Sequence, residues 1–95
     1  MKDRSLKFSG LILREKWGFS SLCLELDVAS CGKTHSQAKR MLQEAVTLHL
    51  ETAIENNLPY LRPVPPSENP IQTSPDSIVE AFDLNVNVRL IAHAA

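Results

Sequence analysis

Residues 22–51 read LCLELDVASCGKTHSQAKRMLQEAVTLHLE, and they decide the fold because a strand, a turn, a short second strand and a long helix follow one another without a spare residue. The first strand begins upstream, since residues 19–27 alternate between apolar and more polar positions. Its leucines share one face, which we expect to contact the helix. The chain turns at residues 27–28 and is predicted to return as a short strand over about residues 29–33.

The start of the helix is the clearest local signal. Thr34 is followed three residues later by Gln37, the spacing of a capping box in which the threonine hydroxyl accepts from the N3 amide and the glutamine reaches back to the cap. We therefore expect a helix from His35 to about Asn56. At about 100° per residue, one broad face collects the side chains predicted to lie on the sheet: Ala38, Met41, Leu42, Ala45, Val46, His49, Thr52 and Ala53.

Two aliphatic residues of the helix fall outside this face. Leu50 and Ile54 are four residues apart and are predicted to form a small exposed apolar patch on the helix flank. Such a patch suits a subunit or partner contact, although two stray aliphatic side chains are also ordinary on a monomer. The reverse face of the helix carries polar residues: Arg40, Gln43, Glu44, Thr47, Glu51 and Glu55.

Further segments complete an antiparallel sheet. Residues 6–14 predict the first strand, and residues 15–18 predict the turn after it. All six prolines lie within residues 57–77, where they exclude a helix or a central strand and predict an extended connector. Residues 78–93 predict a long C-terminal strand. Because an isolated edge strand aggregates, it pairs either within its own sheet or with the same strand of a second subunit.

The predicted architecture is one α+β domain over residues 1–95. It consists of a βββα core over residues 1–56, the Pro-rich connector and the C-terminal strand, with the helix packed on the sheet. A chain of 95 residues with 43% hydrophobic side chains is large enough for one such core. The net charge of −1 gives no general attraction to nucleic acid or membranes. The polar N-terminal segment predicts neither a signal peptide nor a membrane span, so we expect a cytoplasmic protein.

Carboxylates that could hold metal ions are few. Glu25 and Asp27 share a strand face, and a metal site there would need a helix carboxylate such as Glu44 or Glu51 as a third ligand. Both helix glutamates point away from the face that is expected to contact the sheet. We therefore interpret all of these residues as surface carboxylates.

The cysteines do not predict a site either. Cys23, Cys31 and His35 lack the close paired spacing of a zinc motif. The two cysteines lie symmetrically about Asp27, would face each other across a hairpin centred there, and are expected to remain thiols in a reducing cytosol. Neither forms an identifiable catalytic set with His49. No enzymatic activity, cofactor or metal site is predicted.

Three ring side chains have two interpretations each. His49 lies near the centre of the apolar face, where a histidine usually packs and hydrogen-bonds a backbone carbonyl or a strand side chain. Its functional alternative is a pH-sensitive interface. Trp17 and Phe19, beside the first turn, are either partner anchors or a cap on one end of the core.

Residues 22–51 also carry a family pattern. The pattern comprises a strand like LCPELDVAS, then G-x-T, then a helix with regularly spaced alanine, leucine and glutamate. The residues that match it are Leu22, Cys23, Glu25, Leu26, Asp27, Val28, Ala29, Ser30, Gly32, Thr34, Ala38, Leu42, Glu44, Ala45, Leu48, Leu50 and Glu51. In these residues the chain resembles the HicB family of antitoxins. The resemblance implies a reduced ribonuclease H-like core of three strands, a helix and a strand.

The resemblance also implies a function and a partner. A HicB-like antitoxin belongs to a toxin–antitoxin system and masks a small, basic, HicA-like mRNA-cleaving toxin by protein–protein interaction. Many members append a DNA-binding segment, but most residues after Pro70 are assigned to the terminal strand here, so DNA binding is not predicted. The expected toxin interface combines carboxylates with apolar side chains: Trp17, Phe19, Glu44, Leu50, Glu51, Ile54 and Glu55.

Two other functions remain open. The chain is alternatively a stand-alone scaffold or ligand-sensing module with no toxin partner. It would then assemble as a dimer or tetramer through the C-terminal strand or the helix flank. A further alternative is an RNA-binding module that uses the basic first strand and stacks bases on Phe8, Trp17 and Phe19.

Overall fold

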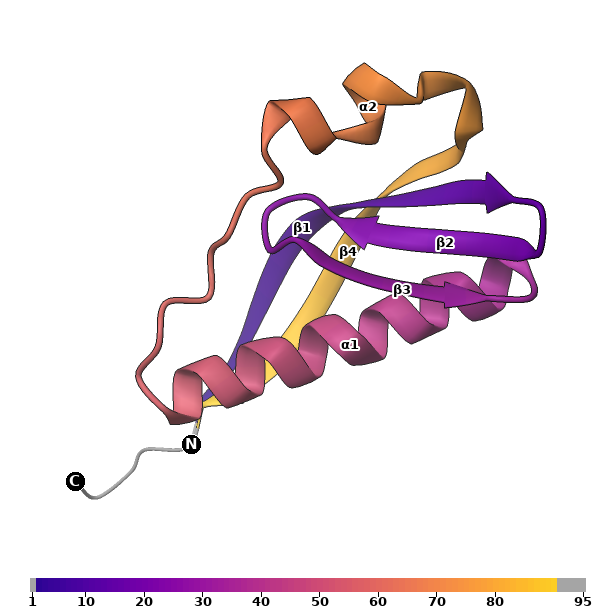
Figure 1. Cartoon of the computed structure of the whole chain (residues 1–95). Helices are drawn as coiled ribbons and strands as arrows, with labels where there is room; N and C mark the ends of the chain where they lie inside the picture. Colours follow the sequence, from indigo (N-terminus) through magenta and orange to yellow (C-terminus); the bar gives the residue numbers. More distant parts are fainter. Residues whose placement is uncertain (1, 91–95) are drawn as a thin grey trace.

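The computed structural model of the protein describes the backbone of residues 2–90 and the side chains of residues 5–87. Its elements are β1 (Lys2–Glu15), β2 (Gly18–Cys23), β3 (Val28–Gly32), α1 (His35–Glu55), the 3-10 turn η1 (Pro66–Glu68), α2 (Pro70–Thr73), the 3-10 turn η2 (Pro75–Ser77) and β4 (Ile78–Leu90). The four strands form one antiparallel sheet in the order β3-β2-β1-β4. Helix α1 covers one face, and the segment with α2 lies over the other (Figure 1). The predicted α+β architecture is thus confirmed.

The face of β2 that contacts the helix differs from the prediction. The strand ends at Cys23, and residues 24–27 form the turn. Ser21 and Cys23 lie opposite Ile12 and Gly10 of β1 and are buried against α1. The prediction that the leucines of this segment face the helix is therefore wrong for Leu22, which takes the opposite face. It holds for Leu26, which lies in the turn and is buried in the core with Leu42 and Val46 of α1. Both faces of the sheet are covered, so the alternation of apolar residues does not reveal which face the helix takes.

The same turn separates the two cysteines. Cys23 pairs with Val28 and Cys31 pairs with Ser20, because the hairpin is centred between residues 25 and 26 and not at Asp27. Cys23 is buried, Cys31 is exposed, and both are free thiols. The conditional prediction that they face each other is therefore wrong.

Helix α1 begins at His35, as the capping signal predicts, and ends at Glu55, one residue before the predicted end. The Thr34 hydroxyl accepts from the Gln37 amide at 3.1 Å. The Gln37 side chain accepts from the amide of Lys33, one residue before the cap, at 2.7 Å. The reciprocal bond of the capping box is thus displaced by one residue.

Among the described residues, no helix has the length and apolar character needed to cross a membrane.

The buried side of α1 is rotated from the predicted face. Its buried residues are Ala38, Leu42, Val46, Leu50 and Ala53. Leu50 is fully buried and Ile54 packs partly buried against the core, so the predicted exposed patch at these two residues is wrong. A row of residues four apart runs obliquely round a helix, and packing on this row turns Leu48 toward solvent. Leu48 is 65% exposed.

The core lies between α1 and the sheet. It is built from side chains of β1, the β2–β3 hairpin, α1 and β4: Phe8, Cys23, Leu26, Leu42, Val46, Leu50, Leu84 and Val86. A Cβ atom at Gly10 would lie 2.5 Å from the Phe82 ring, so glycine is needed for the ring to pack across β1.

Strand β4 pairs with β1 from Lys2↔Leu90 to Leu13↔Ile78. The C-terminal strand therefore completes its own sheet, and predicted strand residues 91–93 lie outside the described residues.

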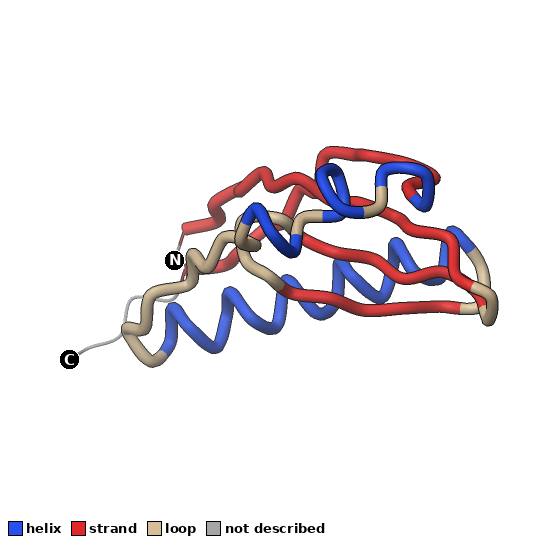
Figure 2. Tube along the Cα trace, turned by 45° about the horizontal axis from the view of Figure 1, so that its top comes forward, coloured by secondary structure: helices blue, strands red, loops and turns tan. Residues whose placement is uncertain are grey.

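The connector is less extended than predicted. It contains three short helical turns, each of which begins with a proline at its first position, where the missing amide removes no helical hydrogen bond. Before them, the amides of Arg62 and Val64 donate to the carbonyls of Glu25 and Leu24 at 3.0 and 2.8 Å. The connector thus passes over the sheet face opposite α1 (Figure 2).

The orientation of α1 can be tested with two leucines of the same helix. We predict that Leu50→Ala lowers the free energy of unfolding by about 2–5 kcal/mol, because it leaves a cavity in the core. Leu48→Ala is the matched control and should change it by less than about 0.5 kcal/mol. Urea unfolding followed by circular dichroism measures both. Equal losses in the two variants would contradict this orientation.

Candidate protein-interaction surface

An apolar groove runs along one flank of α1, near its C-terminal end. Its volume is about 460 Å³, and it is lined by Val28, Ala45, Leu48, His49, Thr52, Ala53, Leu58 and Pro59. Leu48 and Leu58 are 65% and 56% exposed, so large apolar side chains face solvent here. Exposed apolar surface gathered in a concave site is typical of a binding surface.

The end of α1 shapes this groove. Asn57 adopts the left-handed conformation, with φ of 54°. The amide of Leu58 donates to the Ala53 carbonyl at 2.8 Å, and the amide of Asn57 donates to the Ile54 carbonyl at 3.2 Å. These two bonds define a Schellman motif, which commonly brings the residue after the left-handed position against the last helical turn. Here it places Leu58 beside Ala53 in the groove.

His49 holds the connector against the helix. Its Nε2–H donates to the carbonyl oxygen of Tyr60 at 3.1 Å. The prediction that this histidine packs and hydrogen-bonds a backbone carbonyl is confirmed. The contact fixes Leu58 and Pro59 at the groove, because they lie in the chain between the helix end and Tyr60.

Three glutamates of α1 lie next to the groove, on the solvent side of Leu48. At about 100° per residue, Glu44, Glu51 and Glu55 point within a narrow sector beside Leu48. All three are exposed. Glu44 is 3.9 Å from Arg40, but both side chains are about two-thirds exposed, so this ion pair neutralises the surface only weakly. The groove therefore presents an apolar floor with an acidic border.

The seven predicted interface residues do not lie together. Glu44, Glu51 and Glu55 border the groove, whereas Leu50 is buried and Ile54 is half-buried against the core. Trp17 is 60% exposed in the β1–β2 turn, at the other end of α1 (Figure 1). Phe19 lies near that end too, with its ring centroid 6.0 Å from that of His35.

Sequence reasoning missed Leu48 and Leu58 as groove residues. Leu48 is out of phase with the buried row of the helix, and this spacing was the available signal.

Phe8, which the RNA-binding alternative would use for base stacking, is 6% exposed and belongs to the core. Its burial removes one of the three rings on which that alternative depends.

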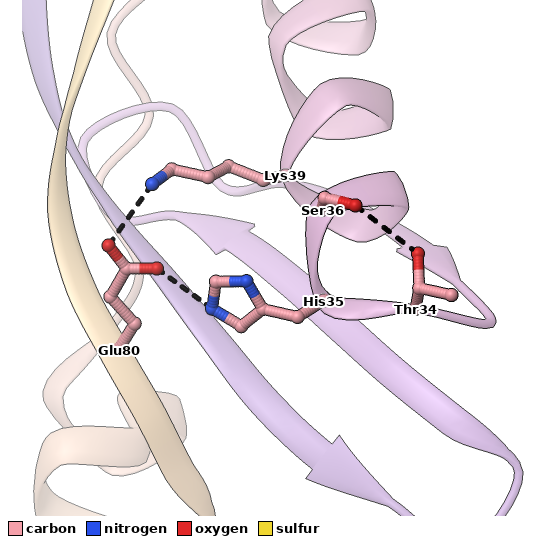
Figure 3. Close-up of polar contacts among 5 residues, drawn as sticks. All are labelled: Thr34, His35, Ser36, Lys39 and Glu80. Atoms are coloured by element: carbon pink, nitrogen blue, oxygen red, sulfur yellow. Dashed lines mark hydrogen bonds and ion pairs between the residues drawn. The ribbon is translucent and has the colours of Figure 1, made fainter.

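Polar contacts join the start of α1 to β4 (Figure 3). Glu80 lies 2.8 Å from His35 Nε2 and 3.1 Å from Lys39 Nζ. The Lys39 ammonium also lies 4.6 Å from the centroid of the Phe82 ring. These partly exposed contacts fix the helix over the sheet edge and lie outside the groove.

Glu25 and Cys23, at the β2–β3 hairpin, have structural contacts. Glu25 accepts from the amide and the hydroxyl of Ser9, both at 2.8 Å. Within the described part of the chain, no three histidine, cysteine, aspartate or glutamate residues are close enough to hold a metal ion. Burial, and secondarily the Glu25 carboxylate, raise the pKa of Cys23 to about 11. This thiol therefore stays protonated at neutral pH.

The raised pKa predicts a pH dependence of stability. The unfolded thiol titrates near pH 9, so the contribution of Cys23 to stability is complete below pH 9 and is lost as the pH rises toward about 11. We expect the stability difference between the native chain and Cys23→Ala to narrow over this range, by up to about 1.4 kcal/mol per pH unit. Urea unfolding of both proteins under reducing conditions measures it. A stability difference between the two proteins that stays constant from pH 8 to 11 would contradict the raised pKa of Cys23.

No family model, curated protein or solved structure matches the chain. The functional conclusion therefore depends on the geometry of the described residues and on the resemblance carried by residues 22–51.

Proposed function

We propose that the chain is a non-catalytic, HicB-like antitoxin that binds and masks a small, basic, HicA-like mRNA-cleaving toxin. Its domain would be the reduced ribonuclease H-like core of that family. The observation that carries this proposal is the apolar groove at Leu48 with its border of three glutamates. The sequence resemblance of residues 22–51 names the class of partner.

The chemistry of the groove suits a cationic protein partner. A ribonuclease that binds RNA presents basic side chains around its active site, since it must neutralise phosphates. Glu44, Glu51 and Glu55 offer carboxylates of opposite charge, which accelerate association and select against acidic partners. Leu48 and Leu58 supply the apolar contact that loses water at the centre of an interface.

The inhibition would need only steric exclusion of the RNA and pairing of the toxin's cations with the glutamates. An apolar side chain of the toxin would enter the groove, while cations beside it approach the glutamates. The RNA-binding cations of the toxin would then be covered, and the substrate would be excluded. Such a contact lies entirely on α1, the start of β3 and the first connector residues, so it requires no change in the sheet.

Affinity purification from the native host tests the proposal. A tagged chain should recover a small basic protein in stoichiometric amount, and co-expression of the chain should relieve the growth arrest that this protein causes. Leu48→Lys should weaken the complex by at least tenfold in Kd, because it removes an apolar contact and adds a charge that repels a basic partner. Leu61→Lys, at a residue of similar exposure outside the groove, is the matched control.

Three outcomes would contradict the proposal. Recovery of the chain alone would favour the stand-alone module. Capture of an acidic partner would conflict with the charge of the groove. Equal weakening by Leu48→Lys and Leu61→Lys would show that the partner binds elsewhere.

A further inference from the structure

Strand β4 forms a long free edge of the sheet. It spans Ile78–Leu90 and pairs with β1 on one side only. The opposite edge strand, β3, has five residues and packs closely on α1. An edge strand presents backbone groups that can pair with another strand, and β4 offers the longer of the two edges.

The hydrogen bonds of Ser9 show which residues of β4 face this edge. Its amide donates to Glu25 at 2.8 Å and its carbonyl accepts from the Leu24 amide at 3.0 Å, both on the β2 side. In antiparallel sheets the amide and carbonyl of a residue point the same way, and Ser9 lies opposite Asp83. The main-chain groups of Asp83 therefore point away from β1. The outward residues, which alternate along the strand, are Ala81, Asp83, Asn85 and Asn87.

This edge is almost unprotected within the described residues. Gln43 Nε2 donates to the Asn85 carbonyl at 2.7 Å, and this oxygen has a second lone pair for another donor. Residues 81–87 contain neither lysine nor proline, and their one charged side chain, Asp83, lies 3.5 Å from Lys7 of β1. Their outer-face side chains at 83, 85 and 87 are short, polar and exposed, so they leave the backbone accessible.

We propose that this edge binds a second copy of the chain, with the two β4 strands antiparallel about a two-fold axis at Asn85. Asn85 would then lie opposite Asn85 of the second copy, and Asp83 opposite Asn87. Each outward amide would meet an outward carbonyl, and the two sheets would join into one. Both subunits would contribute the same surface to this contact, as closed two-fold symmetry requires.

Charge favours this register over one centred on Asp83. Centring the axis on Asp83 would place two carboxylates directly opposite each other, which is destabilising. Centring it on Asn85 separates the two Asp83 side chains by four residues along the strands, about 13 Å. Two neutral amides then lie on the axis, where they can hydrogen-bond each other.

The neighbouring helix flank permits the approach. Gln43 and Thr47 lie four residues apart on the β4 side of α1, and both are uncharged and half-buried. The apolar groove lies on the other flank of α1 and stays accessible in the pair. The inference therefore stands apart from the proposed antitoxin function, and either can fail alone.

A cysteine placed on the axis tests the register. In a Cys31→Ser chain, which keeps only the buried Cys23, Asn85→Cys should form a disulfide-linked dimer under mild oxidation. Directly opposed residues of a hydrogen-bonded pair have Cα atoms about 5.5 Å apart, within the range of a disulfide. Lys7→Cys is the matched control, since it lies beside Asn85 on β1 and its symmetry mate would be about 14 Å away.

The mass in solution provides the second measurement. Light scattering of the unmodified chain, without other proteins, should give twice the 10.6 kDa of one chain. Asn85→Lys places two like charges on the axis and should give a monomer with an unchanged circular dichroism spectrum. A native chain that is still monomeric at about 100 μM, a dimeric Asn85→Lys, or equal cross-linking of Asn85→Cys and Lys7→Cys would overturn the inference.

Discussion

The oblique row of side chains on α1, from Ala38 through Leu42 and Val46 to Leu50, is the contact on which the rest of the structure depends. These residues are fully buried against the sheet. Burying each of the large side chains contributes about 1.5–3 kcal/mol, so this row supplies much of the stability of a small domain. It also fixes the rotation of the helix, and thereby decides which residues of α1 are left at the surface.

The two flanks of α1 then acquire different chemistry. One flank carries Leu48 beside three glutamates, and the helix end adds Leu58 through the left-handed turn at Asn57. The opposite flank lies next to β4, where Lys39 pairs with Glu80 and the uncharged Gln43 donates a hydrogen bond to the strand edge. A rotation of the helix by one residue would bury Leu48 and expose Leu50, and the groove would lose its apolar floor. The helix packing and the proposed binding surface are therefore two consequences of one contact.

Much of the fold was predictable because its signals are local. The cap at Thr34, the prolines of the connector and the alternation of β4 each depend on a few neighbouring residues, and the structure has all three elements near the predicted bounds. The wrong predictions for the helix patch and for the second strand both concern which side chains face inward. Leu50 and Leu48 are both leucines, and the alternating residues 19–24 fit either face of a sheet that is covered on both sides. Only contacts between distant segments decide these cases.

The candidate site was predictable in its charge and not in its apolar part. Exposed glutamates on a helix are recognised from the sequence, whereas the groove needs the helix rotation, the Schellman turn and the His49 contact with Tyr60 together.

The central claim, that a basic protein binds in this groove, is tested most directly by amide chemical-shift mapping of the labelled chain with its co-purified partner. The account predicts shifts gathered at residues 44–59. Shifts centred on the β1–β2 turn around Trp17 would contradict it.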